Sequence, residues 1–208
     1  LDDTRRFYGT MKDAVAMVGD LCRRHGIDAW IHDGGEVSLA HLPSRWAELE
    51  EERDFMARIF GEKLTLLTVA ELKEKGLWAP TFHGGIHNAA GFSIHPLNYV
   101  RGLARAVYEA GVPIHGASRV LRWEESGGGH RLTTAGGTLT ANRVIVATNG
   151  YTPEDISPYH EGRLMPALSN IIVTRPLSEA ERTEQGWTSR LMAFDTRNLL
   201  HYFRLLPD

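Results

Sequence analysis

The sequence has a single cysteine, no long hydrophobic run and no block of basic residues. With Cys22 alone, neither an intramolecular disulfide nor a cluster of thiolate metal ligands can form. No apolar run approaches the roughly 20 residues that cross a bilayer, and no signal-peptide pattern opens the chain. We therefore expect a cytoplasmic protein without a membrane partner.

The charge of the chain is low and evenly spread. The 208 residues include 26 acidic and 23 basic side chains, for a formal net charge of -3, and 42% of them are hydrophobic. Without a run of Lys and Arg the chain has no surface to follow a phosphate backbone, so nucleic acid is not an expected partner. These proportions are those of a globular protein and exclude a disordered chain, a fibre or a coiled coil.

Helices are predicted from apolar spacing and from residues typical of helix ends. Pro96 suits a first helical turn, and Ser178 with Glu181 forms a capping box that starts a helix. The acidic run 48–52 is interpreted as a solvated helix face. The predicted helices are, in chain order, 4–25, a charged stretch after Pro43 and Ser44 that ends at Gly61, 70–75, 96–110, and one that begins at Ser178.

Strands are predicted from short apolar or β-branched runs bounded by turn residues. A turn at 33–35 predicts a hairpin of its two flanking strands, and glycines at 127–129 and 136–137 predict an antiparallel meander. The runs 112–115 and 143–147 are typical of a buried parallel sheet. The predicted strands are 28–32, 36–40, 112–115, 119–124, 130–134, 138–139, 143–147, 169–174, 191–194 and 199–205.

Short motifs follow one another in a characteristic order between Ser93 and Arg204. They are Ser93-Ile94-His95-Pro96-Leu97-Asn98, Gly111-Val112-Pro113-Ile114, the run 143–151, Met165-Pro166, the run 173–177, Asp195-Thr196-Arg197-Asn198 and Tyr202-Phe203-Arg204. In this order and spacing they resemble the D-amino-acid-oxidase-like FAD-dependent oxidoreductases, in particular the glycine and sarcosine oxidase and gamma-glutamylputrescine oxidoreductase branch.

The resemblance implies a mixed α/β fold. It contains part of a FAD-binding doubly wound domain with a β-meander, and part of an antiparallel substrate-domain sheet. It places a helical and hairpin segment, partly of the substrate domain, at 1–80, the second half of the FAD-binding domain at 81–152, and truncated substrate-domain strands at 153–208. It also implies an internal fragment of an enzyme that oxidises an amine or amino acid to an imine, with hydride transfer to FAD.

The resemblance also implies which residues meet the cofactor and the substrate. Val120 should touch the FAD adenosine through its backbone, and the turn formed by Ala147, Thr148, Asn149 and Gly150 should lie beside the cofactor. An ordinary loop exit from a strand explains the same turn. Tyr202 and Arg204 should face the substrate, with Arg204 pairing with a carboxylate. An edge-strand surface pair explains them equally well. No catalytic nucleophile is identified.

Histidines raise the question of a metal site. His83 and His87 have i, i+4 spacing, which suits metal ligands only on a helix, and Gly84-Gly85 between them disfavours a helix. No metal site is therefore predicted. His95, directly before Pro96, is interpreted as a helix-start residue.

A dinucleotide-binding Gly-x-Gly-x-x-Gly turn that opens a helix does not occur in this sequence. FAD is therefore assigned to the parent protein, and we expect little or no FAD retention by these 208 residues. The competing hypothesis is a non-enzymatic module with a degenerate flavoprotein fold that binds a small ligand or a partner. Flavin absorbance separates the two.

Overall fold

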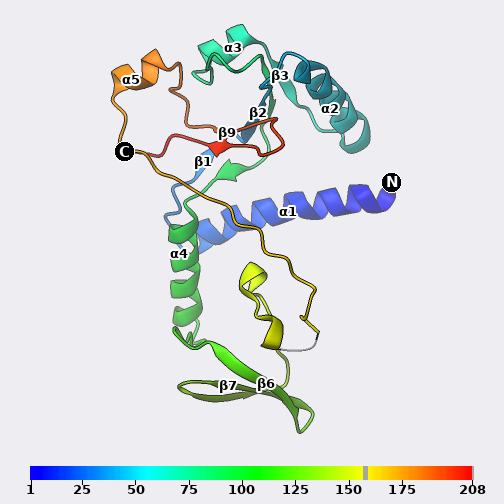
Figure 1. Ribbon diagram of the computed structural model, residues 1–208, viewed down its shortest axis with the longest axis vertical. Helices are drawn as coiled ribbons and strands as arrows, with labels where there is room; N and C mark the ends of the chain where they lie inside the picture. Colours follow the sequence, from blue (N-terminus) through cyan, green and yellow to red (C-terminus); the bar gives the residue numbers. More distant parts are fainter. Residues whose placement is uncertain (157–158, 208) are drawn as a thin grey trace. The chain divides into compact units, whose positions relative to one another are not determined.

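The computed structural model describes residues 1–156 and 159–207. The chain divides into two units, one made of Leu1–Val112 and Thr174–Asp208 and the other of Pro113–Val173. The longer helices all belong to the first unit and confirm the predicted ones (Figure 1). They are α1 (Asp2–Arg24), α2 (Arg45–Phe60), α3 (Val69–Glu74), α4 (Pro96–Glu109) and α5 (Glu179–Glu184).

Local hydrogen bonds explain where these helices begin and end. Ser178 and Glu181 form both halves of the predicted capping box at α5. The ring Nδ1 of His95 accepts a hydrogen bond from the backbone N–H of Asn98 at 3.2 Å, which confirms His95 as the residue that starts α4. Helix α2 ends at Gly61, whose φ of 71° is a left-handed conformation that glycine adopts without strain.

A five-stranded sheet forms the centre of the first unit. Its order is β10-β9-β2-β4-β3, and only β2 and β9 run parallel to each other. The expected antiparallel sheet is therefore present with one parallel pair. The strands are β2 (Glu36–Leu39), β3 (Thr65–Leu67), β4 (Gly85–Asn88), β9 (Met192–Asp195) and β10 (Tyr202–Phe203).

Each face of this sheet has its own apolar cluster, because successive side chains of a strand point to opposite faces. Val37 and Leu39 pack with Leu72 of α3 on one face. Ile86 packs with Leu49 of α2 on the other. The two helices therefore cover opposite faces of the sheet, and both lie next to β3 in Figure 1.

The predicted hairpin around residues 33–35 is wrong. Strand β1 (His32–Asp33) pairs with β5 (Phe92–Ser93), whereas β2 pairs with β4 and β9. Gly34 and Gly35 have φ values of 112° and 73°. They carry the chain from a two-stranded ladder into the larger sheet, so the turn residues were recognised but their strands pair elsewhere.

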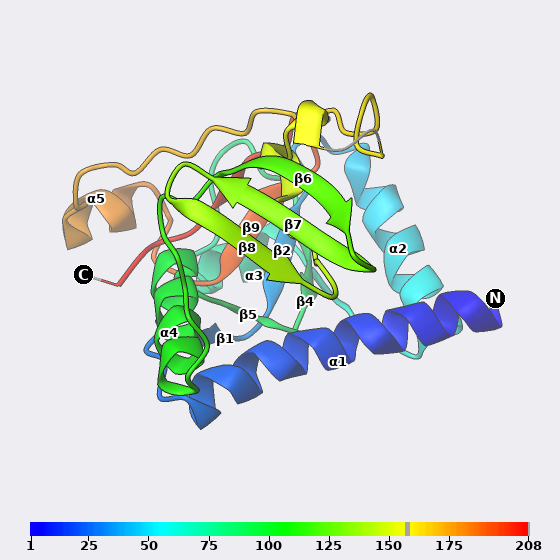
Figure 2. The same ribbon diagram turned by 90° about the horizontal axis from the view of Figure 1, so that it is seen from below.

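The second unit contains the predicted meander. Strands β6 (Val120–Ser126), β7 (Gly129–Thr134) and β8 (Gly137–Ala141) pair antiparallel in sequence order and lie side by side in Figure 2. Gly127 and Gly128, with φ of 61° and 80°, form the two-residue turn between β6 and β7. The meander prediction is confirmed.

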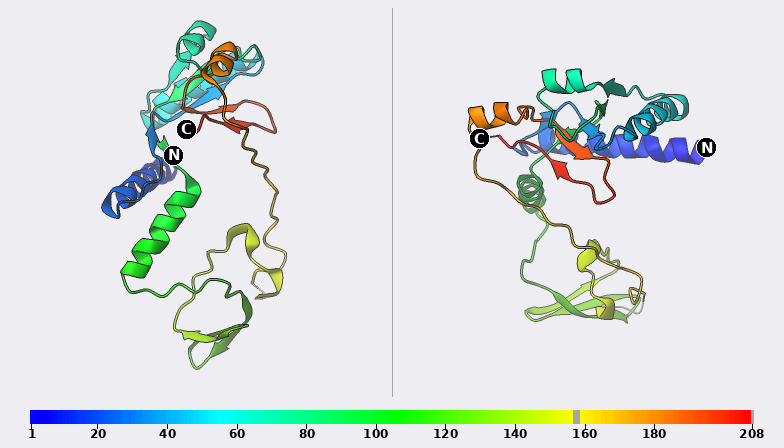
Figure 3. Two further views of the ribbon diagram at one scale, coloured as in Figure 1. Left: turned by 90° about the vertical axis from the view of Figure 1, so that its left-hand side faces the viewer. Right: turned by 45° about the horizontal axis from the view of Figure 1, so that its top comes forward.

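Three predicted strands do not form in the described part of the chain. The runs 112–115, 143–147 and 169–174 contain no strand residues, and Figure 3 shows the long segment before α5 as an extended trace. Ile145 is 91% exposed and Ile171 is 89% exposed. A strand requires a neighbour for its backbone N–H and C=O groups, and no described strand pairs with these runs. Their apolar character is real, but these three strand predictions are wrong.

The predicted fold class is confirmed, since the chain is a mixed α/β protein with several sheets and includes the meander. The predicted domain boundaries after residues 80 and 152 stay predictions. Among the described helices, none has the length and apolar character needed to span a membrane.

Candidate functional site

A pocket of about 280 Å³ lies in the first unit, close to the lower end of roughly 300 Å³ for small-molecule sites. Strands β1 and β5 form part of its wall, and the segment after β10 forms another part. The lining residues are Trp30, Ile31, His32, Ser93, Arg190, Arg204, Leu205 and Pro207.

Arg204 is anchored in this pocket by a backbone carbonyl group from a distant part of the chain. Its Nη2 donates a hydrogen bond to the carbonyl oxygen of Ile94 at 2.8 Å, which ties the end of β10 to the residue after β5. Burial lowers the pKa of the guanidinium below its ordinary value. The group stays charged at neutral pH because an arginine pKa begins far above it. Its remaining N–H donors have no described protein partner.

Two further polar groups of the pocket lack partners. Arg190 is exposed and makes no ion pair or hydrogen bond with any residue that the structure describes. Ser93 is 3% exposed, and its hydroxyl has no hydrogen-bond partner within the described ranges. A buried hydroxyl without a partner costs free energy, so such a group is a sign of a ligand or a water molecule.

Trp30 contributes a strained backbone to the same pocket. Its φ of 48° lies in the left-handed region, which is unusual for a bulky residue. Asp28 Oδ1 accepts a hydrogen bond from the backbone N–H of Trp30 at 3.3 Å. The Trp30 ring meets the ring of His95 edge-on, with 4.6 Å between the ring centroids. Strained conformations of this kind concentrate at functional sites.

The structure separates the two residues predicted to bind the substrate. Arg204 lines the pocket, whereas Tyr202 does not and is 77% exposed, with its ring beside that of Phe194. Their roles stay predictions. Sequence reasoning missed Trp30, Arg190 and the orphan hydroxyl of Ser93. Ser93 stands in a motif that was noted, but no sequence signal marked the other two.

Asp195 holds the loop that leads to β10 and Arg204. Only 1% exposed, it accepts hydrogen bonds from the backbone N–H of Arg197 at 3.2 Å and of His201 at 3.3 Å, and from His201 Nδ1 at 3.0 Å. The guanidinium of Arg197 also pairs with it. Burial raises the pKa of this carboxyl, but the hydrogen bonds from His201 and then Arg197 outweigh it, so the pKa lies below its usual value.

The residues predicted to contact a cofactor lie in the second unit. Val120 opens β6 opposite Thr134, next to an irregularity in the ladder. The turn 147–150 is exposed, and Asn149 has a φ of 47° at the start of a 3-10 turn, η1 (Asn149–Tyr151). The side chains of the turn 147–150 have little bulk and leave its backbone accessible to a ligand. Cofactor binding by these residues stays a prediction.

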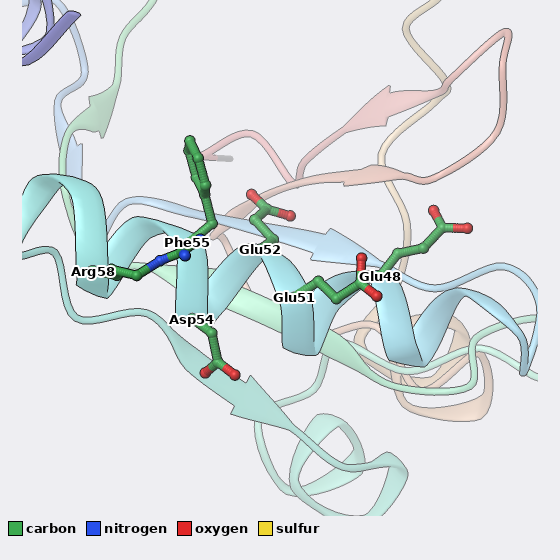
Figure 4. Close-up of a pocket in the computed structure, with 6 residues that line it drawn as sticks. All are labelled: Glu48, Glu51, Glu52, Asp54, Phe55 and Arg58. Carbon is green, nitrogen blue, oxygen red and sulfur yellow. The ribbon is translucent and has the colours of Figure 1, made fainter. Parts of the chain in front are cut away.

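A second hollow lies along helix α2 and has a different character. Figure 4 shows its lining side chains projecting from this single helix: Glu48, Glu51, Glu52, Asp54, Phe55 and Arg58. Burial, and secondarily the charge of Glu36, raises the pKa of Glu52. Within the described ranges, every lining residue belongs to α2, so the hollow corresponds to the acidic helix face expected from the sequence.

One of the two histidines considered as metal ligands, His87, makes a structural contact. His87 lies on β4, and its Nε2 is 2.6 Å from the carbonyl oxygen of Gly34, which ties β4 to the turn after β1. Within the described ranges, no group of three His, Cys, Asp or Glu residues is arranged to hold a metal ion.

Comparison with known proteins identifies the family of this chain. The family model DAO, FAD dependent oxidoreductase, matches residues 1–208, and this chain belongs to that family. The gamma-glutamylputrescine oxidoreductase of Escherichia coli is 28% identical over 207 residues, which cover 99% of this chain and 48% of that protein.

Two solved structures have a similar fold. Glycine oxidase from Geobacillus kaustophilus matches with a TM-score of 0.60 and 26% identity, over 68% of this chain and 39% of that one. L-proline dehydrogenase from P. horikoshii matches with a TM-score of 0.67 and 16% identity, over 89% and 49%. The chain spans about half the length of the curated relatives that it matches.

Proposed function

We propose that this chain is part of a FAD-dependent oxidoreductase that oxidises the C–N bond of an amine or amino acid. The observation that carries the proposal is the pocket around Arg204, a charged and half-buried guanidinium with unused donors. Membership of the FAD dependent oxidoreductase family supports the reaction class. A cytoplasmic location, expected from the single cysteine, belongs to the same proposal.

The residues present fit part of a FAD site. The turn formed by Ala147, Thr148, Asn149 and Gly150 is exposed, has little side-chain bulk and contains a left-handed residue, all of which suit close approach of a flat ligand to the backbone. Val120 would contact the adenosine part through its backbone. These 208 residues do not contain a glycine-rich turn that opens a helix, so the diphosphate would be held by other residues.

When bound, FAD supplies the acceptor for the hydride that leaves the carbon next to nitrogen. The substrate nitrogen loses a proton, the C–N bond becomes C=N, and water then hydrolyses the imine to a carbonyl compound and an amine or ammonia. The pocket has to bind and orient the substrate. Arg204 would pair with a substrate carboxylate, and Trp30 and Leu205 would limit access of water.

The test uses the purified protein that carries this chain. We expect bound flavin in its visible spectrum, bleached by an amino acid in the absence of oxygen. Arg204→Gln should raise KM for a carboxylate-bearing substrate by about tenfold to a hundredfold, because a charged hydrogen bond contributes about 1.5–3 kcal/mol. Arg101→Gln, at an exposed position of α4 outside the pocket, is the matched control and should leave KM unchanged.

A second candidate function is a binding module without redox chemistry. The same pocket supports it, because an orphan hydroxyl and unpaired guanidinium groups call for a polar ligand whether or not that ligand reacts. A colourless protein that acquires no flavin spectrum on incubation with FAD would favour this alternative and refute the oxidoreductase.

A further inference from the structure

The positive charge of the pocket exceeds what one substrate carboxylate needs. Arg190 and Arg204 both line it, and among residues 1–156 and 159–207 no Asp or Glu does. Arg204 gives one N–H to the carbonyl of Ile94, which is a neutral acceptor and leaves its charge uncompensated. Arg190 has no partner in the described part of the chain. Two like charges in one small pocket repel each other and favour a ligand that neutralises both.

The orphan hydroxyl of Ser93 adds an independent indication of a ligand. It belongs to β5 in the wall of the pocket and is buried without a hydrogen-bond partner among described residues. The backbone of Trp30 in the same wall is strained at a φ of 48°. Strain and an unsatisfied polar atom in one wall are costs that ligand binding would offset.

We propose that this pocket binds a dianionic ligand of the dicarboxylate class, with one carboxylate on Arg204, the other on Arg190 and the Ser93 hydroxyl as a neutral donor. A single carboxylate shared by both guanidinium groups would leave one positive charge unpaired, whereas a dicarboxylate leaves none. The inference rests on the proposed function in taking the pocket as the substrate site, and it assigns an acidic amine or amino acid with a second carboxylate as the substrate class.

The experiment compares two ligands of equal length, glutarate and pentanoate, which differ in the second carboxylate. Their affinities for the purified protein are measured by calorimetry. We expect glutarate to bind about fivefold more tightly, the upper range for an ion pair with an exposed arginine. Arg190→Gln should abolish the preference, and Arg190→Lys should retain part of it. Arg101→Gln, the control, should leave the preference for glutarate unchanged.

Two further variants separate the parts of the site. Ser93→Ala should weaken both ligands by a similar factor, since the hydroxyl does not distinguish them. Arg204→Gln should also weaken both. Circular dichroism confirms that each variant is folded, and Arg190 is exposed, so its replacement should not disturb the fold.

The proposal is overturned if the unaltered protein binds neither ligand, if it binds the two equally, or if the preference for glutarate survives Arg190→Gln. These outcomes differ from failure of the oxidoreductase. If the protein is yellow, its flavin is reduced by an amine and it shows no preference for glutarate, only the proposed dianion site is refuted. A colourless protein that prefers glutarate keeps the site and loses the redox function.

Discussion

Gly35→Ala should lower the free energy of unfolding by about 2–5 kcal/mol, from the left-handed backbone and the overlap together. Gly35 has a φ of 73°, and an added Cβ would lie 1.9 Å from the carbonyl oxygen of Asn88. The neighbour is backbone of the adjacent strand β4 and cannot rotate away. Urea unfolding followed by tryptophan fluorescence measures the change.

Gly26→Ala separates the two causes. Gly26 also has a left-handed backbone, with a φ of 56°, but nothing lies within 4 Å of an added Cβ. Only the conformational cost remains, so we expect a loss of about 1–2 kcal/mol. Equal losses at both positions would show that strand β4 yields to the new methyl group and that the close approach at Gly35 is not a constraint.

Asp195→Asn should destabilise the first unit by about 2 kcal/mol, because it weakens the hydrogen bonds that a buried carboxylate accepts from Arg197 and His201. Because the side chains of Arg197 and His201 are partly exposed, the expected loss in free energy of unfolding is smaller than for a fully buried ion pair. The loop before β10 should loosen, and glutarate affinity should fall because Arg204 follows this loop.

The sign of the pH dependence follows from the lowered pKa of Asp195. The folded protein holds this carboxylate ionised more strongly than the unfolded chain does, so its contribution is complete above the unfolded pKa of about 3.9. It is lost as the pH falls through the folded pKa. Stability curves from about pH 7 down to about pH 2 should therefore converge for Asp195→Asn and the unaltered protein at the acid end.

Asp3→Asn is the matched control, since it makes the same substitution in an exposed ion pair with Arg6. An exposed pair of this kind contributes about 0.5 kcal/mol or less. A gap near pH 7 that closes at acid pH for Asp195→Asn, with nearly superimposed curves at every pH for the control, would assign the effect to the buried carboxylate. Parallel curves at every pH would contradict the role assigned to Asp195.

The helices and the meander were predictable because their signals are local. A capping box such as Ser178 with Glu181 uses atoms three residues apart, and the turn at Gly127 and Gly128 needs only the backbone freedom of two glycines. Each such element is specified by residues that are neighbours in the chain, so the sequence pattern and the structure agree.

Strand pairing was less predictable, because a strand's partner is chosen over long sequence separations. The residues around Gly34 and Gly35 were read correctly as a turn, yet β1 pairs with β5 and β2 pairs with β4 and β9. The run 143–147 has the composition of a buried strand but no partner within the described chain. Composition shows that a segment can form a strand, whereas the tertiary structure decides whether another strand lies beside it.

The sequence alone thus established the class of protein, the helices, the meander and Arg204 as a candidate for anion binding, because these depend on composition, local spacing and motif order. Assembly of the pocket required the fold. Trp30, Ser93, Arg190 and Arg204 are spread over most of the chain and meet only because β1 pairs with β5 and Arg204 bonds to the carbonyl of Ile94. The single cysteine and the lack of basic blocks excluded a thiolate metal cluster and nucleic-acid binding from the sequence alone. The charge of a ligand, in contrast, depends on which side chains the tertiary structure brings together.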